Sequence, residues 1–140
     1  MADVIYNSFK AALLKADVDF EVDTIKVALV TSTYVADQDV HDFFNDITNE
    51  VVGTGYTAGG ATLGSKTVTQ DNTDNEGVFD AADTVWATST ITARGAVIYK
   101  STGTASTSAL INYIDFGSDK SSSGGDFTVT WHAEGLINVN

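Results

Sequence analysis

The chain has 140 residues, of which 43% are hydrophobic and 19% charged, a composition typical of one globular domain rather than a disordered segment. Its 7 basic and 19 acidic residues give a formal net charge of −12, which disfavours nucleic acid and anionic membranes as partners. The absence of cysteine excludes disulfides and thiolate metal sites. The charge either keeps the chain soluble or steers a partner, and the composition alone does not choose between these roles.

The predicted elements begin with an amphipathic helix over residues 3–16. Ile5, Phe9 and Leu13 recur at every fourth position and form an apolar stripe. Asp3 is expected to cap the first turn. Because the polar face is not strongly basic, we expect this helix to lie against the body of the protein and not on a membrane. The acidic start also differs from a secretory signal, so we expect synthesis and folding in the cytosol.

The remainder of the chain, residues 23–140, has the pattern of a β domain. Residues 24–31, TIKVALVT, read as a well-buried strand, and residues 127–132 alternate apolar with polar side chains. Short strands of this kind recur with turn residues between them, which predicts an antiparallel β-sandwich or small barrel. Residues 118–126, SDKSSSGGD, are predicted to be a mobile loop. The whole of 1–140 is then a single domain, mainly β, with an N-terminal α-helix.

A glycine-rich segment at residues 49–60, NEVVGTGYTAGG, invites comparison with phosphate-binding loops. A dinucleotide fingerprint needs G-x-G-x-x-G before a helix, but after Gly53 and Gly55 the next glycine, Gly59, is one place late and precedes a strand-like stretch. Residues 60–67, GATLGSKT, fail the P-loop pattern because a serine separates the glycine from the lysine. We therefore predict tight turns or bulges in this segment.

The sequence holds no recognisable catalytic or metal-binding pattern. Residues 71–80, DNTDNEGVFD, resemble a calcium loop, but Glu76 occupies the position of the required glycine, which favours a solvated turn over a weak calcium site. His41 and His132 are the only histidines and lack a zinc-binding spacing. We expect no catalytic residue, no cofactor and no metal, and hence a protein that is not an enzyme.

Five stretches, in order and covering well over half of the chain, carry a family resemblance. They are YNSFKAALL (6–14), DTIKVALVTSTY (23–34), TNEVVGTGYTAGGATL (48–63), TVWATSTITARGAVIYKS (84–101) and DFGSDKSSSGGDFTVTW (115–131). On these stretches the chain resembles a family of small virion structural proteins of tailed bacteriophages. The resemblance implies capsid decoration or cement as the first expectation, and a tail or head–tail adaptor subunit as the second.

The resemblance also implies a set of partners. They are the major capsid protein or other virion proteins, and further copies of this chain in a symmetric homo-oligomer. The expected location is the virion, after synthesis in the host cytoplasm. We expect the N-terminal helix and the glycine- and serine-rich loops to make the assembly contacts. The candidate residues are Ile5, Phe9, Leu13, Gly53, Tyr56, Gly59, Ser122 and Gly124.

A third hypothesis, from another class, is a β-sandwich that binds carbohydrate or calcium. A carbohydrate site of this kind needs an aromatic platform that is open to solvent. Tyr34, Tyr56 and Trp86 are the candidates for such a platform.

Overall fold

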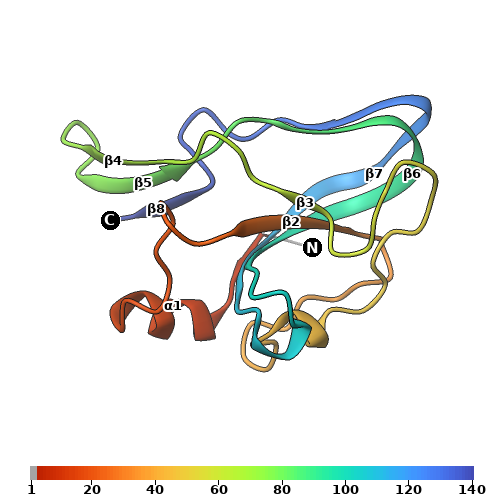
Figure 1. The fold of residues 1–140 in the computed structure, drawn as a ribbon. Coiled ribbons are helices and arrows are strands. Elements are labelled where there is room, and N and C mark those ends of the chain that lie inside the picture. Colours follow the sequence, from red (N-terminus) through yellow and green to blue (C-terminus); the bar gives the residue numbers. More distant parts are fainter. Residues whose placement is uncertain (1–2) are drawn as a thin grey trace.

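The computed structural model describes residues 3–140 and is mainly β, with two antiparallel sheets and a short helix near the N-terminus (Figure 1). The expected antiparallel sandwich with an N-terminal helix is confirmed, and the two sheets do not close into a barrel within the described residues. The elements are β1 (Val4–Ile5), α1 (Asn7–Leu14), β2 (Ile25–Val30), η1 (Phe44–Asp46), β3 (Ala61–Thr62), β4 (Thr67–Asp71), β5 (Glu76–Asp80), β6 (Thr84–Lys100), η2 (Ala105–Thr107), β7 (Leu110–Val129) and β8 (Ile137–Val139).

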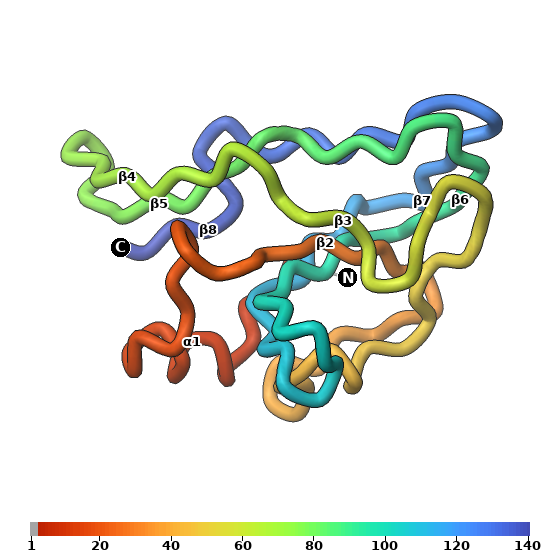
Figure 2. Tube along the Cα trace, viewed as in Figure 1, coloured from red at the N-terminus to blue at the C-terminus, as the bar shows by residue number. Residues whose placement is uncertain are grey.

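The larger sheet has the order β1-β7-β6-β2-β3, and the smaller sheet has the order β4-β5-β8. The two long strands, β6 with 17 residues and β7 with 20, pair with each other and turn back together at one end of the molecule (Figures 1 and 2). Their register shifts on both sides of Ser89, and Thr88 has a φ of 50°, a conformation that β-branched residues rarely adopt. The bend lets one strand pair contribute to both layers.

The predicted mobile loop at residues 118–126 is wrong, because the whole segment lies within β7. Its serines pair with hydroxyl-bearing residues of β6: the Oγ atoms of Ser89 and Ser122 are 2.6 Å apart, and Thr92 Oγ1 is 2.7 Å from Ser121 Oγ. A serine- and glycine-rich composition lacks the apolar alternation of a strand. Here hydroxyl pairs across the two strands take the place of apolar cross-strand contacts.

Strand β2 is buried on both faces, as its sequence predicts. Val27 and Leu29 point into the main core between the layers, while Ala28 and Val30 contact a second cluster that contains Tyr6 and other tyrosines. Each fully buried aliphatic side chain contributes about 1.5–3 kcal/mol to folding. Packing on both faces explains why TIKVALVT carries apolar residues at consecutive positions.

The N-terminal helix is shorter than the predicted range 3–16. Val4 and Ile5 form β1, and the helix begins only after Tyr6, whose backbone is extended (φ −67°, ψ 140°) and whose ring is fully buried. Asp3 does not cap the helix. Its Oδ1 instead accepts a hydrogen bond from the backbone N–H of Asp115 at 2.8 Å, so it fastens the chain to the edge of β7.

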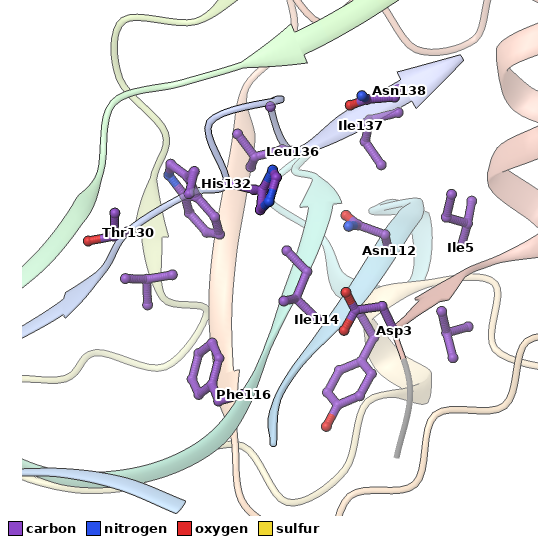
Figure 3. A pocket seen from close by; sticks show the side chains of 15 residues that line it. Asp3, Ile5, Asn112, Ile114, Phe116, Thr130, His132, Leu136, Ile137 and Asn138 are labelled. Atoms are coloured by element: carbon purple, nitrogen blue, oxygen red, sulfur yellow. The ribbon is translucent and has the colours of Figure 1, made fainter. Parts of the chain in front are cut away.

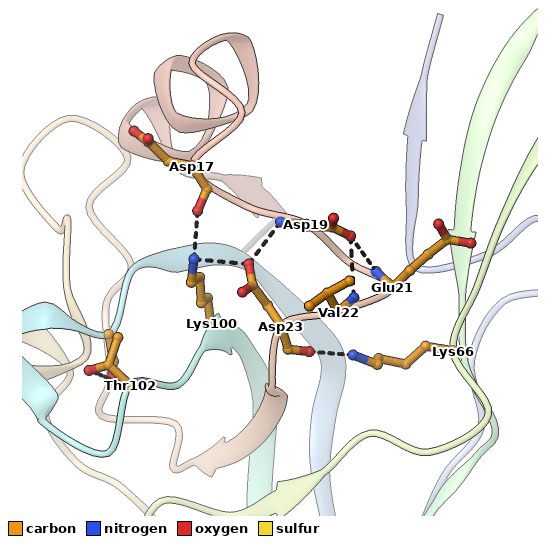
Figure 4. A network of polar contacts seen from close by, with 9 residues as sticks. Asp17, Asp19, Glu21, Val22, Asp23, Lys66, Lys100 and Thr102 are labelled. Atoms are coloured by element: carbon orange, nitrogen blue, oxygen red, sulfur yellow. Dashed lines mark hydrogen bonds and ion pairs between the residues drawn. The ribbon is translucent and has the colours of Figure 1, made fainter.

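A polar network fastens the segment between α1 and β2 to the sheet (Figure 4). Lys100 Nζ donates to the carbonyl oxygen of Asp17 at 2.7 Å and lies 2.9 Å from Asp23 Oδ2. The same carboxylate accepts the N–H of Asp19 at 2.8 Å, and Lys66 Nζ donates to the Asp23 carbonyl. One lysine therefore holds both ends of this loop, and Val18 and Phe20 between them are buried in the main core.

Because ionised Asp23 takes part in this network, we expect part of the free energy of unfolding to depend on pH. Burial by itself raises the pKa of Asp23, but the Asp19 amide and the Lys100 ammonium outweigh that effect and hold its pKa below the ordinary value. The contribution is therefore fully present above about pH 4, where an unfolded aspartate is ionised, and is lost as the pH falls through the lower folded pKa. The Asp23→Asn variant should unfold at lower denaturant than wild type at pH 7, and the difference should shrink towards pH 3. Equal differences at both pH values would contradict the assignment.

Candidate functional site

Three adjoining cavities follow one open side of the sandwich. The first, about 310 Å³, lies between α1 and β8; the second, about 550 Å³, lies between the first half of β7 and the C-terminal segment; the third, about 380 Å³, lies inside the bend of β7. Ile5 and Ile137 line both the first and the second, and Phe116 and Val129 line both the second and the third. We call this continuous depression the edge groove.

The central cavity of the edge groove is walled by apolar side chains from both layers (Figure 3). Ile114 and Phe116 come from β7, while Trp131 and Leu136 come from the segment between β7 and β8. Trp131 is held in place because its indole Nε1–H donates to the Ala82 carbonyl at 2.9 Å. The wall on that side is therefore fixed before anything enters the cavity.

Asp3, Thr130, His132 and Asn138 also line this cavity and are exposed, whereas Asn112 of β7 is a buried polar residue in its wall. Its residue is only 5% exposed, and its amide end points into the central cavity (Figure 3). The Oδ1 atom is buried and has no hydrogen-bond partner among the described residues. A buried acceptor without a partner costs about 1–3 kcal/mol, so it is an unusual feature for a strand that is otherwise apolar here.

Just beyond β1, backbone amides of β7 donate hydrogen bonds to carboxylates. Asp3 Oδ1 accepts the N–H of Asp115, and Asp115 Oδ1 accepts the N–H of Gly117 at 2.8 Å. Burial opposes ionisation of Asp115, but the Arg94 guanidinium, 2.8 Å away, and the Gly117 amide hold its pKa well below the usual range. Charged groups on a strand edge disfavour pairing with another strand. The groove is therefore better suited to receiving side chains than to extending the sheet.

Three of the predicted assembly residues lie together in this groove. Ile5, Phe9 and Leu13 line the cavity between α1 and β8, beside Leu14, whose residue is 90% exposed. Phe9 is buried at the bottom, whereas Ile5 is 37% exposed. The apolar stripe of the helix thus serves both the core and an accessible surface.

The other predicted residues of the glycine-rich segment make internal contacts. The Tyr56 hydroxyl accepts the backbone N–H of Leu29 at 2.9 Å and donates to Glu50 Oε1 at 2.7 Å. The Gly59 amide donates to the same Glu50 oxygen at 2.6 Å, and a Cβ on Gly53 would lie 2.8 Å from Ile91 Cγ2. As predicted, this segment forms tight turns, and its glycines allow close backbone approach to β2 and β6.

Ser122 and Gly124 lie at the bend of β6 and β7, away from the helix. Ser122 pairs with Ser89, and the Gly124 amide donates to Thr90 Oγ1 at 3.0 Å. Gly124 has a φ of 67°, which suits a glycine in a β-bulge. The eight predicted assembly residues therefore fall in three separate places.

The geometry gives little support to the carbohydrate hypothesis. Tyr34 and Trp86 are 2% and 6% exposed, so neither forms an open aromatic platform. Tyr56 is half-buried, and its hydroxyl is engaged by Leu29 and Glu50.

The segment compared with a calcium loop is a hairpin between β4 and β5, where Asp71 Oδ1 accepts the amides of Thr73 and Asp74. Near this hairpin, one carboxylate oxygen from each of Asp74, Glu76 and Glu134 lies within 4.8 Å of the others. Carboxylate oxygens are ligands that Ca²⁺ accepts. Two of these acids are exposed, and Glu76 Oε1 already accepts a hydrogen bond from Asn138 at 2.7 Å.

Within residues 3–140, no helix is long and apolar enough to span a membrane. Comparison of the chain with protein-family models, with curated proteins and with solved structures gives no match.

Proposed function

We propose that this chain is a non-enzymatic virion structural protein of a tailed bacteriophage, a capsid decoration protein that binds the outer shell and stabilises it. The proposal rests mainly on the edge groove. It offers a partly exposed apolar surface built from the N-terminal helix, β7 and β8, and such surfaces on folded proteins are commonly protein-interaction sites. The sequence resemblance indicates which class of partner to test first.

The distribution of charge supports binding to protein rather than to DNA. The net charge is −12, yet the helix side of the groove is lined by Lys10 and by no acidic residue. An acidic outer surface suits a position away from packaged DNA, because like charges repel. A ligand that binds only the intact shell stabilises it by mass action, which is how decoration strengthens a capsid.

The proposal predicts that Leu14→Gln weakens binding to purified empty capsids about tenfold or more, because burying a glutamine amide in an apolar contact is unfavourable. Leu14 is 90% exposed, so its replacement should leave the free energy of unfolding almost unchanged. Cosedimentation with capsids measures the binding, and urea unfolding measures the stability.

Val22→Gln is the matched control, because Val22 is 80% exposed but lies outside the three cavities of the groove. It should bind capsids as the wild type does. Equal binding by wild type and both variants would show that the groove is not the contact surface. Absence of binding by the wild type itself would contradict the decoration role and favour the tail or adaptor subunit.

A further inference from the structure

The central cavity of the edge groove combines an apolar wall with one buried, unsatisfied amide. Its volume of about 550 Å³ is in the range of ligand-binding pockets, and its walls are fixed by the packing of both layers. Most buried polar atoms in folded proteins have a hydrogen-bond partner. The unpaired Oδ1 of Asn112 therefore marks a place where a partner from outside the chain can supply the missing donor.

The chemistry of an asparagine side chain narrows the class of occupant. A carboxamide presents an acceptor and donors side by side, which matches the N–H and C=O groups of a peptide bond. A purely aliphatic ligand, such as an acyl chain, offers no donor to Oδ1. The surrounding Ile114, Phe116 and Leu136 side chains fit an apolar side chain next to that peptide group.

The negative charge of the protein disfavours acidic peptides as occupants of the cavity. Among the residues lining the cavity, Asp3 is the only carboxylate, and it stands in a chain whose net charge is −12. An acidic peptide would meet repulsion from the protein as a whole, whereas an uncharged or basic one would not.

We propose that this cavity is a peptide-recognition site for an extended, uncharged or basic segment of a partner protein. An apolar side chain of that segment fills the cavity, and a backbone N–H donates to Asn112 Oδ1. The identification of the partner as a virion protein rests on the proposed function. The recognition chemistry itself is tested without capsids.

The test uses the full chain and the blocked pentapeptide acetyl-Thr-Leu-Thr-Phe-Thr-amide as the probe. Titration is followed by NMR at the Asn112 side-chain amide and the Trp131 indole N–H. We expect saturable shifts of both signals in the millimolar range or tighter. A counterpart with glutamate in place of the two outer threonines should bind more weakly at low salt.

The decisive variant is Asn112→Leu, which keeps the volume but removes the acceptor. It should fold with equal or greater stability, because the unsatisfied buried atom is gone, and should bind the peptide about tenfold more weakly. Ser8→Ala is the matched control: Ser8 Oγ is also buried without a partner among the described residues, but it does not line the cavity. This control should bind the peptide as the wild type does.

Three outcomes would overturn the inference. They are the absence of saturable shifts in wild type, unchanged affinity in Asn112→Leu, and a homodimer whose contact buries the cavity, since a second copy would then be the occupant. If capsids bind but the peptide does not, the proposed function stands and this inference fails. If the peptide binds but capsids do not, the recognition site stands and the decoration role fails.

Discussion

Replacing Gly60 by alanine should destabilise the protein by about 3–5 kcal/mol, a large part of the 5–15 kcal/mol typical of a domain. Gly60 has a φ of +73°, and a Cβ atom there would lie 2.6 Å from the carbonyl carbon of Val27 and closer still to its oxygen. Val27 belongs to β2, an interior strand between β6 and β3, so the backbone cannot move aside without disturbing the core. Urea unfolding by circular dichroism measures the effect.

Gly64→Ala is the matched control for this prediction. Gly64 lies four residues further along, and a Cβ atom there would meet nothing within 4 Å. The free energy of unfolding of this variant should lie within about 0.5 kcal/mol of the wild-type value or slightly above it, because alanine reduces the conformational freedom of the unfolded chain. If both variants lose the same stability, the close approach of Gly60 to β2 is not the cause.

Tyr56→Phe should lower the free energy of unfolding by about 2 kcal/mol, the second-largest loss of stability that we expect from a single substitution. The lost hydroxyl leaves the N–H of Leu29 and the carboxylate of Glu50 each without one partner. Leu29 is fully buried, so water cannot easily replace the missing acceptor. The ring itself remains and keeps its packing beside Trp86, so the measured loss in urea unfolding reports the hydrogen bonds.

Tyr99→Phe provides a graded comparison, because the Tyr99 hydroxyl also bonds within the glycine-rich segment. The Tyr99 hydroxyl makes one hydrogen bond, to the Gly59 carbonyl at 2.6 Å, and burial together with the Glu50 carboxylate raises the pKa of Tyr99 to about 12. We expect a loss of about 1 kcal/mol, roughly half that of Tyr56→Phe. A larger loss in Tyr99→Phe than in Tyr56→Phe would contradict the central role given to the Tyr56 hydroxyl.

The fold class could be predicted from the sequence because its signals are local. The alternation in residues 24–31 and the many short apolar runs indicate buried strands in an antiparallel sandwich, whichever strands they pair with. The start of the helix and the strand character of residues 118–126 could not be predicted in this way. The first depends on burial of the Tyr6 ring and the second on hydroxyl pairing with β6, and both are contacts between distant residues.

The candidate site was only half predictable for the same reason. The helical stripe of Ile5, Phe9 and Leu13 is visible in the sequence, and these residues line one end of the edge groove. The central cavity forms where β7 meets the C-terminal segment, and sequence spacing does not reveal that meeting. One signal was present, namely the asparagine inside the apolar run ALINYIDF, since Asn112 interrupts a pattern that is otherwise typical of a buried strand.

The most direct test of the central claim is quantitative mass spectrometry of intact, purified virions of the phage proposed to encode this chain, with its copies counted against the major capsid protein. The proposed decoration role predicts a ratio near one or near a simple fraction of one. A ratio of a few per cent would place the chain in the tail or at the portal vertex. Absence of the chain from purified virions would contradict a structural role in the particle.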